Sequence, residues 1–126
     1  MDLAVVIDSS VFIQHWRSKN RADTLLTELF QQRKVYVSAV AKYEVLAGVG
    51  EKDMHEWHQI FEDVTVLAFD EATIDVARMV FRQLKQESRM ISLADILIAA
   101  TAMVNDLPLA TLNRKHFERI RGLQML

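Results

Sequence analysis

The stretch Leu3–Ile13, LAVVIDSSVFI, contains the pattern that decides the fold. Its first five residues form an uninterrupted apolar run rich in β-branched side chains, which predicts a strand buried on both faces. Asp8 follows this strand directly, and Ser9 or Ser10 can cap a helix that continues from Val11. The stretch therefore places a carboxylate at the end of a buried strand, where the functional sites of α/β proteins form.

The rest of the chain repeats this alternation of strand and helix. Further strands are predicted at residues 35–37, 64–67 and 109–111, with a short edge strand at 123–126. Helices are predicted at 9–16, 21–32, 38–48, 53–61, 70–84, 93–104 and about 115–120. Ser38 is the predicted cap of the third of these, and Asp70 opens the fifth. This order predicts a three-layer α/β sandwich with a mainly parallel central sheet flanked by helices. Since the chain has 126 residues, we expect residues 1–126 to form a single domain.

Composition excludes several classes of protein. The chain has no cysteine, so disulfides and thiolate metal sites are excluded, and an oxidising compartment is not implied. The N-terminal MDLAVVID has no basic lead and only a short apolar run, so it is read as a strand and not as a signal peptide. No later apolar run is long enough to cross a bilayer. We therefore expect a cytoplasmic protein with no membrane contact.

Charge is distributed unevenly along the chain, although the net charge is only −2. Residues 1–77 carry 7 basic and 13 acidic side chains, whereas residues 78–126 carry 8 basic and 4 acidic ones. Such asymmetry fits a polyanionic partner on one side of the molecule. It equally fits two solvated helix faces, and charge alone favours that second interpretation.

Three carboxylates, Asp8, Glu44 and Asp95, lie within or next to apolar segments, and Asn113 follows the last predicted internal strand. Successive members of this set are 36, 51 and 18 residues apart, so no local turn relates them. A parallel sheet can gather all four at the rim formed by the carboxyl ends of its strands. Clustered like charges repel, and a bound cation relieves that repulsion. Oxygen ligands without cysteine or paired histidines point to Mg²⁺ or Mn²⁺.

Each of these four residues also has a purely structural interpretation. Asp8 can cap the helix that follows it, and Asn113 can cap the last helix. Asp95 completes a capping-box pattern, S-x-x-D, that begins at Ser92. Glu44 can simply face solvent, since isolated glutamates usually do. The sequence leaves both interpretations open at each position.

Other polar residues are weaker candidates for the site. Ser10 and Thr111 flank the predicted carboxylates and can hold a metal-bound water or a phosphate oxygen, and Arg114 and Lys115 can meet a phosphodiester. A metal site at the two histidines of HEWH, residues 55–58, lacks an evident third ligand, so solvent-facing side chains are favoured there. The sequence has no G-x-G-x-x-G, P-loop or G-x-S-x-G motif, so nucleotide binding and serine hydrolysis have no support.

Four segments together resemble the PIN domain, and within it the VapC type of toxin ribonuclease. They are VVIDSSVFI, SAVAKYEVLAGV, ISLADILIAATA and LPLATLNRKHF, and the resemblance runs from residue 3 to about residue 118. In that family the positions that match Asp8, Glu44 and Asp95 are acidic metal ligands. The position that matches Asn113 is often Asp and sometimes Asn, so the resemblance leaves the fourth ligand open. Asn113 would add no charge, which would weaken binding of a second ion.

The resemblance implies magnesium- or manganese-dependent cleavage of RNA, a homodimer, and neutralisation by a small antitoxin protein. In this mechanism Asp8 and Asp95 bind the metal, Glu44 helps directly or through water, and the products are a 5′-phosphate and a 3′-hydroxyl. Apolar helical residues also support dimerisation, namely Leu25, Leu29, Phe30, Phe81 and Leu84.

Three other functions place acidic residues or the same fold in a comparable way. A receiver domain would need a pair of acidic residues after the first strand, and a D-x-D phosphatase would need an acid in place of Ser10. The alternative that remains is a PIN-fold module that binds RNA or a protein without catalysis.

Overall fold

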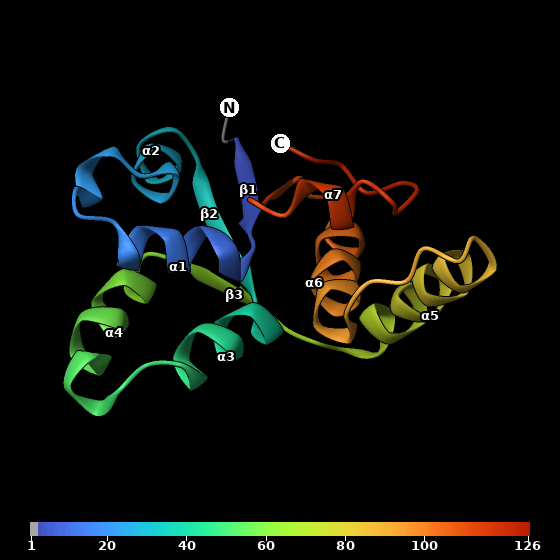
Figure 1. The fold of residues 1–126 in the computed structure, drawn as a ribbon, viewed down its shortest axis with the longest axis horizontal. Helices are drawn as coiled ribbons and strands as arrows, with labels where there is room; N and C mark the ends of the chain where they lie inside the picture. Colours follow the sequence, from blue (N-terminus) through green and yellow to red (C-terminus); the bar gives the residue numbers. More distant parts are fainter. Residues whose placement is uncertain (1–2) are drawn as a thin grey trace.

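The computed structural model describes residues 3–126, in which strands alternate with helices (Figure 1). The strands are β1 (Ala4–Ile7), β2 (Lys34–Ser38), β3 (Thr65–Leu67) and β4 (Leu109–Ala110). The helices are α1 (Ser9–Arg17), α2 (Leu25–Gln32), α3 (Ala39–Ala47), α4 (Met54–Glu62), α5 (Glu71–Gln86), α6 (Leu93–Val104) and α7 (Arg114–Phe117). Two 3₁₀ turns, η1 (Arg21–Asp23) and η2 (Glu51–Asp53), precede α2 and α4.

The four strands form one parallel sheet in the order β3-β2-β1-β4. In its register, Val5 lies opposite Val35 on β2, and Val6 lies opposite Leu109 on β4. The edge strand predicted at 123–126 is present as a single parallel bridge from Met125 to Leu109. Because all the strands run the same way, their carboxyl ends share one edge of the sheet, and that edge positions Asp8.

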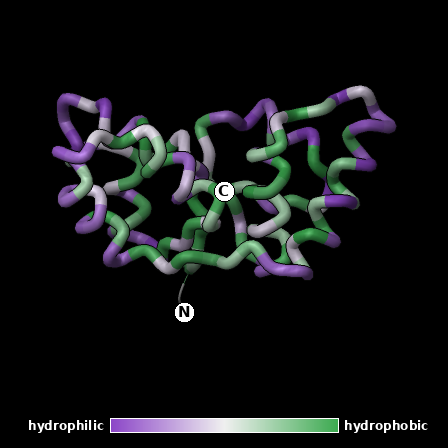
Figure 2. Tube along the Cα trace, turned by 90° about the horizontal axis from the view of Figure 1, so that it is seen from below, coloured by the Kyte–Doolittle hydropathy of each residue, from purple (hydrophilic) through white to green (hydrophobic). Residues whose placement is uncertain are grey.

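Helices cover both faces of the sheet, which confirms the predicted sandwich. Figure 1 shows α1, α2 and α4 on one side of the strands and α5, α6 and α7 on the other. Apolar segments gather toward the middle of the molecule and hydrophilic ones lie at its outer ends (Figure 2). The fully buried side chains at the centre include Val5, Val6, Ile7, Phe12, Leu26, Ile98 and Leu109.

An aromatic cluster joins α1 to α4. The ring of Trp57 lies 4.9 Å from that of Trp16 and 6.5 Å from that of Phe12, measured between centroids, and Phe61 lies 5.0 Å from Phe12. The Arg21 guanidinium sits 4.1 Å from the centre of the Trp16 ring, a cation–π contact. Trp16 therefore packs against the core.

Side-chain caps begin several of the helices, as the sequence predicts. Ser38 accepts a hydrogen bond from the Ala41 N–H at 3.0 Å, and Asp70 accepts one from Thr73 at the same distance. Each bond satisfies an N–H that the first helical turn leaves without a partner. Between residues 3 and 126, no helix is both long enough and apolar enough to span a bilayer.

The continuous helix predicted over 21–32 is wrong, because the chain breaks at Thr24. Thr24 has an extended backbone, and its hydroxyl accepts from the N–H of Thr27, so it acts as the cap of α2. The helical spacing of apolar residues continues across this break. Periodicity alone therefore missed a threonine that begins a new helix.

Two of the residues expected to support dimerisation lie instead in the core. Leu84 is completely buried where α5 packs on α6, and Leu29 is 3% exposed. Phe81 remains 41% exposed on the outer face of α5. The sequence analysis grouped these apolar positions together, because helical spacing does not reveal which side of a helix packs against the rest of the protein.

We predict that Leu84→Ala lowers the free energy of unfolding by about 2–5 kcal/mol, because it leaves a cavity between α5 and α6. Denaturant unfolding followed by circular dichroism measures this change. The matched control is Arg82→Ala on the exposed face of the same helix, which should shift stability by no more than about 0.5 kcal/mol. Equal effects of the two variants would contradict this packing.

Candidate active site

Asp8 is buried at the carboxyl end of β1, with 1% of its surface exposed. It occupies the N-cap position of α1, yet its side chain makes no capping hydrogen bond. Its Oδ2 atom instead accepts hydrogen bonds from the hydroxyls of Ser10 and Thr111, both at 2.8 Å. The capping interpretation of Asp8 is therefore wrong, and hydroxyl groups hold this carboxylate.

The two hydroxyls also hold the turn that follows β4. Ser10 Oγ accepts from the Leu112 N–H at 3.1 Å, and Thr111 Oγ1 accepts from the Asn113 N–H at 2.9 Å. A hydroxyl has one proton, and both of these protons go to Asp8. Ser10 and Thr111 thus position Asp8 against the 111–113 turn, whereas their contact with substrate stays a prediction.

Asp8 has one oxygen with free acceptor capacity. Its Oδ1 atom has only a long 3.4 Å contact from the Ser9 hydroxyl, whereas Oδ2 has two short bonds. A carboxylate oxygen has room for further donors or for a cation. Oδ1 is therefore the atom of Asp8 that can bind a ligand.

The charges of Asp8, Glu44 and Asp95 interact, although the three residues come from distant parts of the chain. Burial raises the pKa of Glu44, a hydrogen bond with Ser9 partly lowers it, and the charges of Asp8 and Asp95 raise it further. Burial also raises the pKa of Asp95, and the charge of Asp8 adds to that rise. Folding thus brings the three predicted acids within electrostatic reach of one another.

Asp95 lies half-buried in the first turn of α6. Its N–H donates to the Ser92 hydroxyl at 3.1 Å, which is the forward half of the predicted capping box. Its carboxylate lies 3.4 Å from Nδ1 of His116 on α7, and this contact lowers the pKa of Asp95 in part. The Asp95 side chain therefore faces α7 and the acids, and Ser92 serves as the cap.

Asn113 and its neighbours form the exposed rim of the site. Asn113 precedes α7 but makes no side-chain cap, so the capping interpretation is wrong here too. The guanidinium of Arg114 donates to the Leu126 carbonyl at 2.8 Å and lies 3.7 Å from Glu118, while Lys115 is exposed. His116, rather than Arg114, approaches the acids. The spacing of residues in the sequence does not predict this contact, because His116 on α7 meets Asp95 on a different helix, α6.

The donors at this edge fit a hard divalent cation in charge and type, since they are carboxylates, and burial together with mutual repulsion raises the pKa values of Glu44 and Asp95. Within residues 3–126, however, no three Asp, Glu or His side chains are arranged to enclose one ion. Mg²⁺ usually binds through one or two carboxylates and keeps several waters. Asp8 and Asp95 can supply such a pair, and the exposed Glu44 can rotate toward it or act through water.

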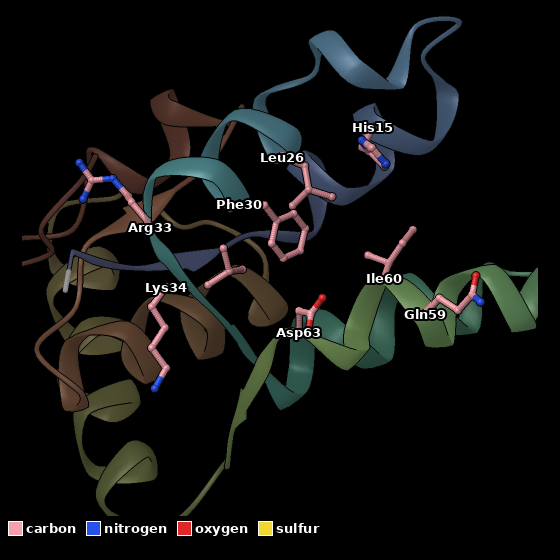
Figure 3. Close-up of a pocket in the computed structure, with 9 residues that line it drawn as sticks. His15, Leu26, Phe30, Arg33, Lys34, Gln59, Ile60 and Asp63 are labelled. Carbon is pink, nitrogen blue, oxygen red and sulfur yellow. The ribbon is translucent and has the colours of Figure 1, made fainter.

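A separate cavity of about 420 Å³ lies between α2 and α4 and contains none of these acids. In Figure 3, Leu26 and Phe30 of α2 face Ile60 of α4 across it. The side chains of His55 and His58, on α4, are both exposed, as the sequence favoured. The acids after β1 and at the start of α6 are therefore the better candidate for a catalytic centre.

A family model described as the PIN domain matches residues 5–123, nearly all of the chain. The chain belongs to the PIN-domain family. Ribonuclease VapC1 of Methanocaldococcus jannaschii is 31% identical to this PIN domain over 118 residues, which cover 93% of this chain and 81% of the relative. Ribonuclease VapC19 of Mycobacterium tuberculosis is 32% identical over 120 residues, covering 94% and 96%. These relatives place it among the VapC proteins.

Solved structures share the fold of this PIN domain. The DNA-bound VapBC structure of Salmonella typhimurium has a TM-score of 0.88 at 20% identity, with 98% of this chain and 97% of that one covered. VapBC-1 of nontypeable Haemophilus influenzae has a TM-score of 0.85 at 22% identity, with the same shares covered. The recognition of a PIN-like fold from four sequence segments is confirmed.

We predict that Asp8→Asn lowers the pKa of both Glu44 and Asp95 in the metal-free protein, because it removes a negative charge that raises them. NMR titration of the carboxyl carbons measures both values. The control Asp63→Asn removes an exposed charge elsewhere, at the end of α4, and should leave them unchanged. Unaltered titration in Asp8→Asn would show that the acids do not share a site.

The same pKa shifts predict a pH dependence of stability. Glu44 and Asp95 bind their protons more tightly in the folded than in the unfolded chain. The free energy of unfolding therefore falls as the pH rises from the ordinary pKa values of these groups through their raised pKa values in the folded chain. We expect this slope in metal-free protein and a shallower one in Asp8→Asn. Thermal unfolding across the acidic range tests it, and identical slopes would contradict the coupling.

Proposed function

We propose that this chain is an endoribonuclease of the VapC type, which hydrolyses RNA phosphodiesters with the help of Mg²⁺ or Mn²⁺. The observation that carries the proposal is the buried Asp8 carboxylate, whose charge acts on Glu44 and Asp95 at the carboxyl edge of the sheet. Membership of the PIN-domain family and the similarity to VapC ribonucleases support RNA as the substrate.

In this proposal Asp8 and Asp95 bind the metal, and Glu44 contributes directly or through water. A bound divalent ion lowers the pKa of a water molecule and stabilises the charge that develops on the phosphoryl oxygens. Ser10 and Thr111 hold Asp8 with its Oδ1 atom available, so no side chain needs to reorganise at that ligand. His116 holds Asp95 from the outer side, and the exposed Asn113 and Lys115 lie where substrate arrives.

We predict that Asp8→Asn reduces metal-dependent RNA cleavage by on the order of 10³-fold or more, because it removes the charge of the central ligand. Cleavage of an RNA pool with Mn²⁺, with and without chelator, measures the loss. The variant should fold, since the amide still accepts bonds from Ser10 and Thr111, and circular dichroism verifies this. Undiminished activity in a folded variant would remove Asp8 from the mechanism.

A second variant tests whether the hydroxyls matter through Asp8. Thr111→Val keeps the shape of the buried side chain but removes one donor to Oδ2, so we expect a loss of about 10- to 100-fold in cleavage and in metal affinity. Calorimetric titration with Mn²⁺ measures the affinity. A variant of Thr27, whose hydroxyl lies away from the acids, serves as a control: Thr27→Val should retain both properties.

The assembly that we propose contains two copies of this chain and a small antitoxin. Exposed apolar side chains support an association surface, namely Tyr43, Ile74, Met79 and Leu93. The cavity between α2 and α4 in Figure 3 combines apolar side chains with charged ones at its edge, which suits an amphipathic helix from a partner. Two solved structures that share this fold support an antitoxin partner, namely one described as a toxin-antitoxin complex from Klebsiella pneumoniae and one from Mycobacterium tuberculosis described as a member of the VapBC family of toxin-antitoxin systems.

We predict that the isolated chain has twice its monomer mass in solution, because these apolar groups are covered by a second copy. Light scattering over a range of concentrations measures the mass. Leu93→Lys, at a side chain that is 70% exposed, should shift the mass toward the monomer without unfolding the chain. A monomer mass at every concentration would contradict the dimer.

A non-catalytic PIN-fold module remains the second candidate, since an RNA- or protein-binding domain can use the same fold. Mn²⁺ calorimetry combined with the RNA cleavage assay separates the two functions. Metal binding with RNA cleavage supports the nuclease, whereas RNA binding without cleavage at any metal concentration supports the module.

A further inference from the structure

A groove of about 610 Å³ begins at Ser10, beside the Asp8 carboxylate, and runs along α1. Ser10, Ile13, Gln14 and Arg17 line one wall, at positions that share one face of the helix. Leu112 and Asn113, from the turn after β4, line the other wall. The groove therefore adjoins the proposed catalytic site at Ser10, which donates to Asp8, and none of the roles proposed above uses Gln14 or Arg17.

Three of the polar side chains that line this groove have no partner within the part of the chain that the structure describes. Gln14, Arg17 and Asn113 are exposed, and between residues 3 and 126 their side chains make no hydrogen bond or ion pair. Some other exposed arginines find partners, for example Arg114 with Glu118 and Arg121 with Glu87, whereas Arg78 and Arg82 resemble Arg17 in having none between residues 3 and 126. The groove thus presents one guanidinium and two primary amides to an incoming ligand.

The apolar part of the groove adds a surface of a different kind. Ile13 and Leu112 both line it, and Leu112 is 46% exposed. A planar ring can lie on such a surface while its edge meets amide groups. An unpaired nucleotide combines these features, because it has an apolar face, an edge of donors and acceptors, and a charged phosphate.

The walls of the groove are set by the bonds that hold Asp8. Ser10 donates to Asp8 and accepts from the Leu112 N–H, and Thr111 donates to Asp8 and accepts from the Asn113 N–H. The position of Asn113 relative to Asp8 is therefore determined by two hydroxyls. A nucleotide seated in the groove would hold its neighbouring phosphodiester in a defined place relative to Asp8.

We propose that this groove binds the nucleotide adjacent to the bond that is cleaved, and that it determines base preference there. Arg17 contacts a phosphate, and the amides of Gln14 and Asn113 contact the base edge while the ring lies on Ile13 and Leu112. The inference rests on the proposed ribonuclease function and goes beyond it, since it assigns substrate selection to residues outside the acids.

The test compares cleavage of a randomised single-stranded RNA pool by the wild type, Gln14→Leu and Arg17→Ala, with Mn²⁺ present. Sequencing of the cleaved ends gives the base preference, and a fixed RNA of the preferred sequence gives KM and kcat. Gln86→Leu and Arg82→Ala, on the exposed face of α5, are the matched controls. Circular dichroism verifies that every variant folds.

We expect Gln14→Leu to reduce discrimination at one position beside the cleaved bond by about tenfold. Arg17→Ala should raise KM severalfold with little change in kcat. It should also reduce the slope of log RNA affinity against log salt concentration by about one, the effect of losing one phosphate contact. The controls should match the wild type in preference and in KM. Fluorescence anisotropy of RNA bound to Asp8→Asn, with and without Arg17→Ala, gives the same comparison without catalysis.

The outcomes separate the groove from the proposed function. If the wild type cleaves RNA and both groove variants keep its preference and KM, the groove proposal is overturned and the nuclease stands. If the variants keep their RNA properties but lose affinity for an antitoxin, the groove binds peptide instead. If the chain cleaves no RNA but Arg17→Ala weakens its RNA affinity measured by anisotropy, the groove proposal is supported and the nuclease proposal is contradicted. If the chain binds no RNA, both proposals are overturned.

Discussion

The carboxylate of Asp8 is almost completely buried, yet only hydroxyl groups hold it. Within residues 3–126 it has no ion pair, and its short hydrogen bonds come from Ser10 and Thr111. A buried charge is costly unless it is compensated, and neutral hydroxyls compensate it less than an arginine or lysine would. This arrangement keeps a negative charge at the end of β1 that is not cancelled within the protein. The interactions at this edge of the sheet follow from that charge.

Burial of the acids and the repulsion between them lower the stability of the folded chain and favour binding of a cation. The raised pKa values of Glu44 and Asp95 mean that ionising these groups at neutral pH disfavours the folded chain. A cation that binds only the folded state would recover this free energy, because binding to the native state stabilises it. Instability in the free protein and affinity for a divalent ion would thus have the same electrostatic origin.

Much of the fold could be predicted from the sequence, because buried strands and capped helices leave local patterns. The run Leu3–Ile7 and the caps Ser38 and Asp70 are examples in which the structure agrees. The break at Thr24 was missed, since apolar spacing continues across it. The burial of Leu84 was missed because it depends on α6, which lies outside the local pattern.

The candidate site could be predicted only in part from the sequence. The proximity of Asp8, Glu44 and Asp95 follows from a parallel sheet that gathers strand ends, so their interaction could be anticipated. The contact of His116 with Asp95 and the bonds of Ser10 and Thr111 could not, because each joins side chains whose directions depend on the packed structure. The metal roles of the acids remain a proposal.

The aromatic cluster between α1 and α4 has an optical consequence. The chain has two tryptophans, and their ring centroids lie 4.9 Å apart, so all of its tryptophan emission originates in one place. Trp16 belongs to the same helix as Ser9 and Ser10, whereas Trp57 is buried and its indole N–H has no partner among residues 3–126. Light emitted by this pair would therefore report on displacements of α1, the helix whose first turn contacts Asp8, without any attached dye.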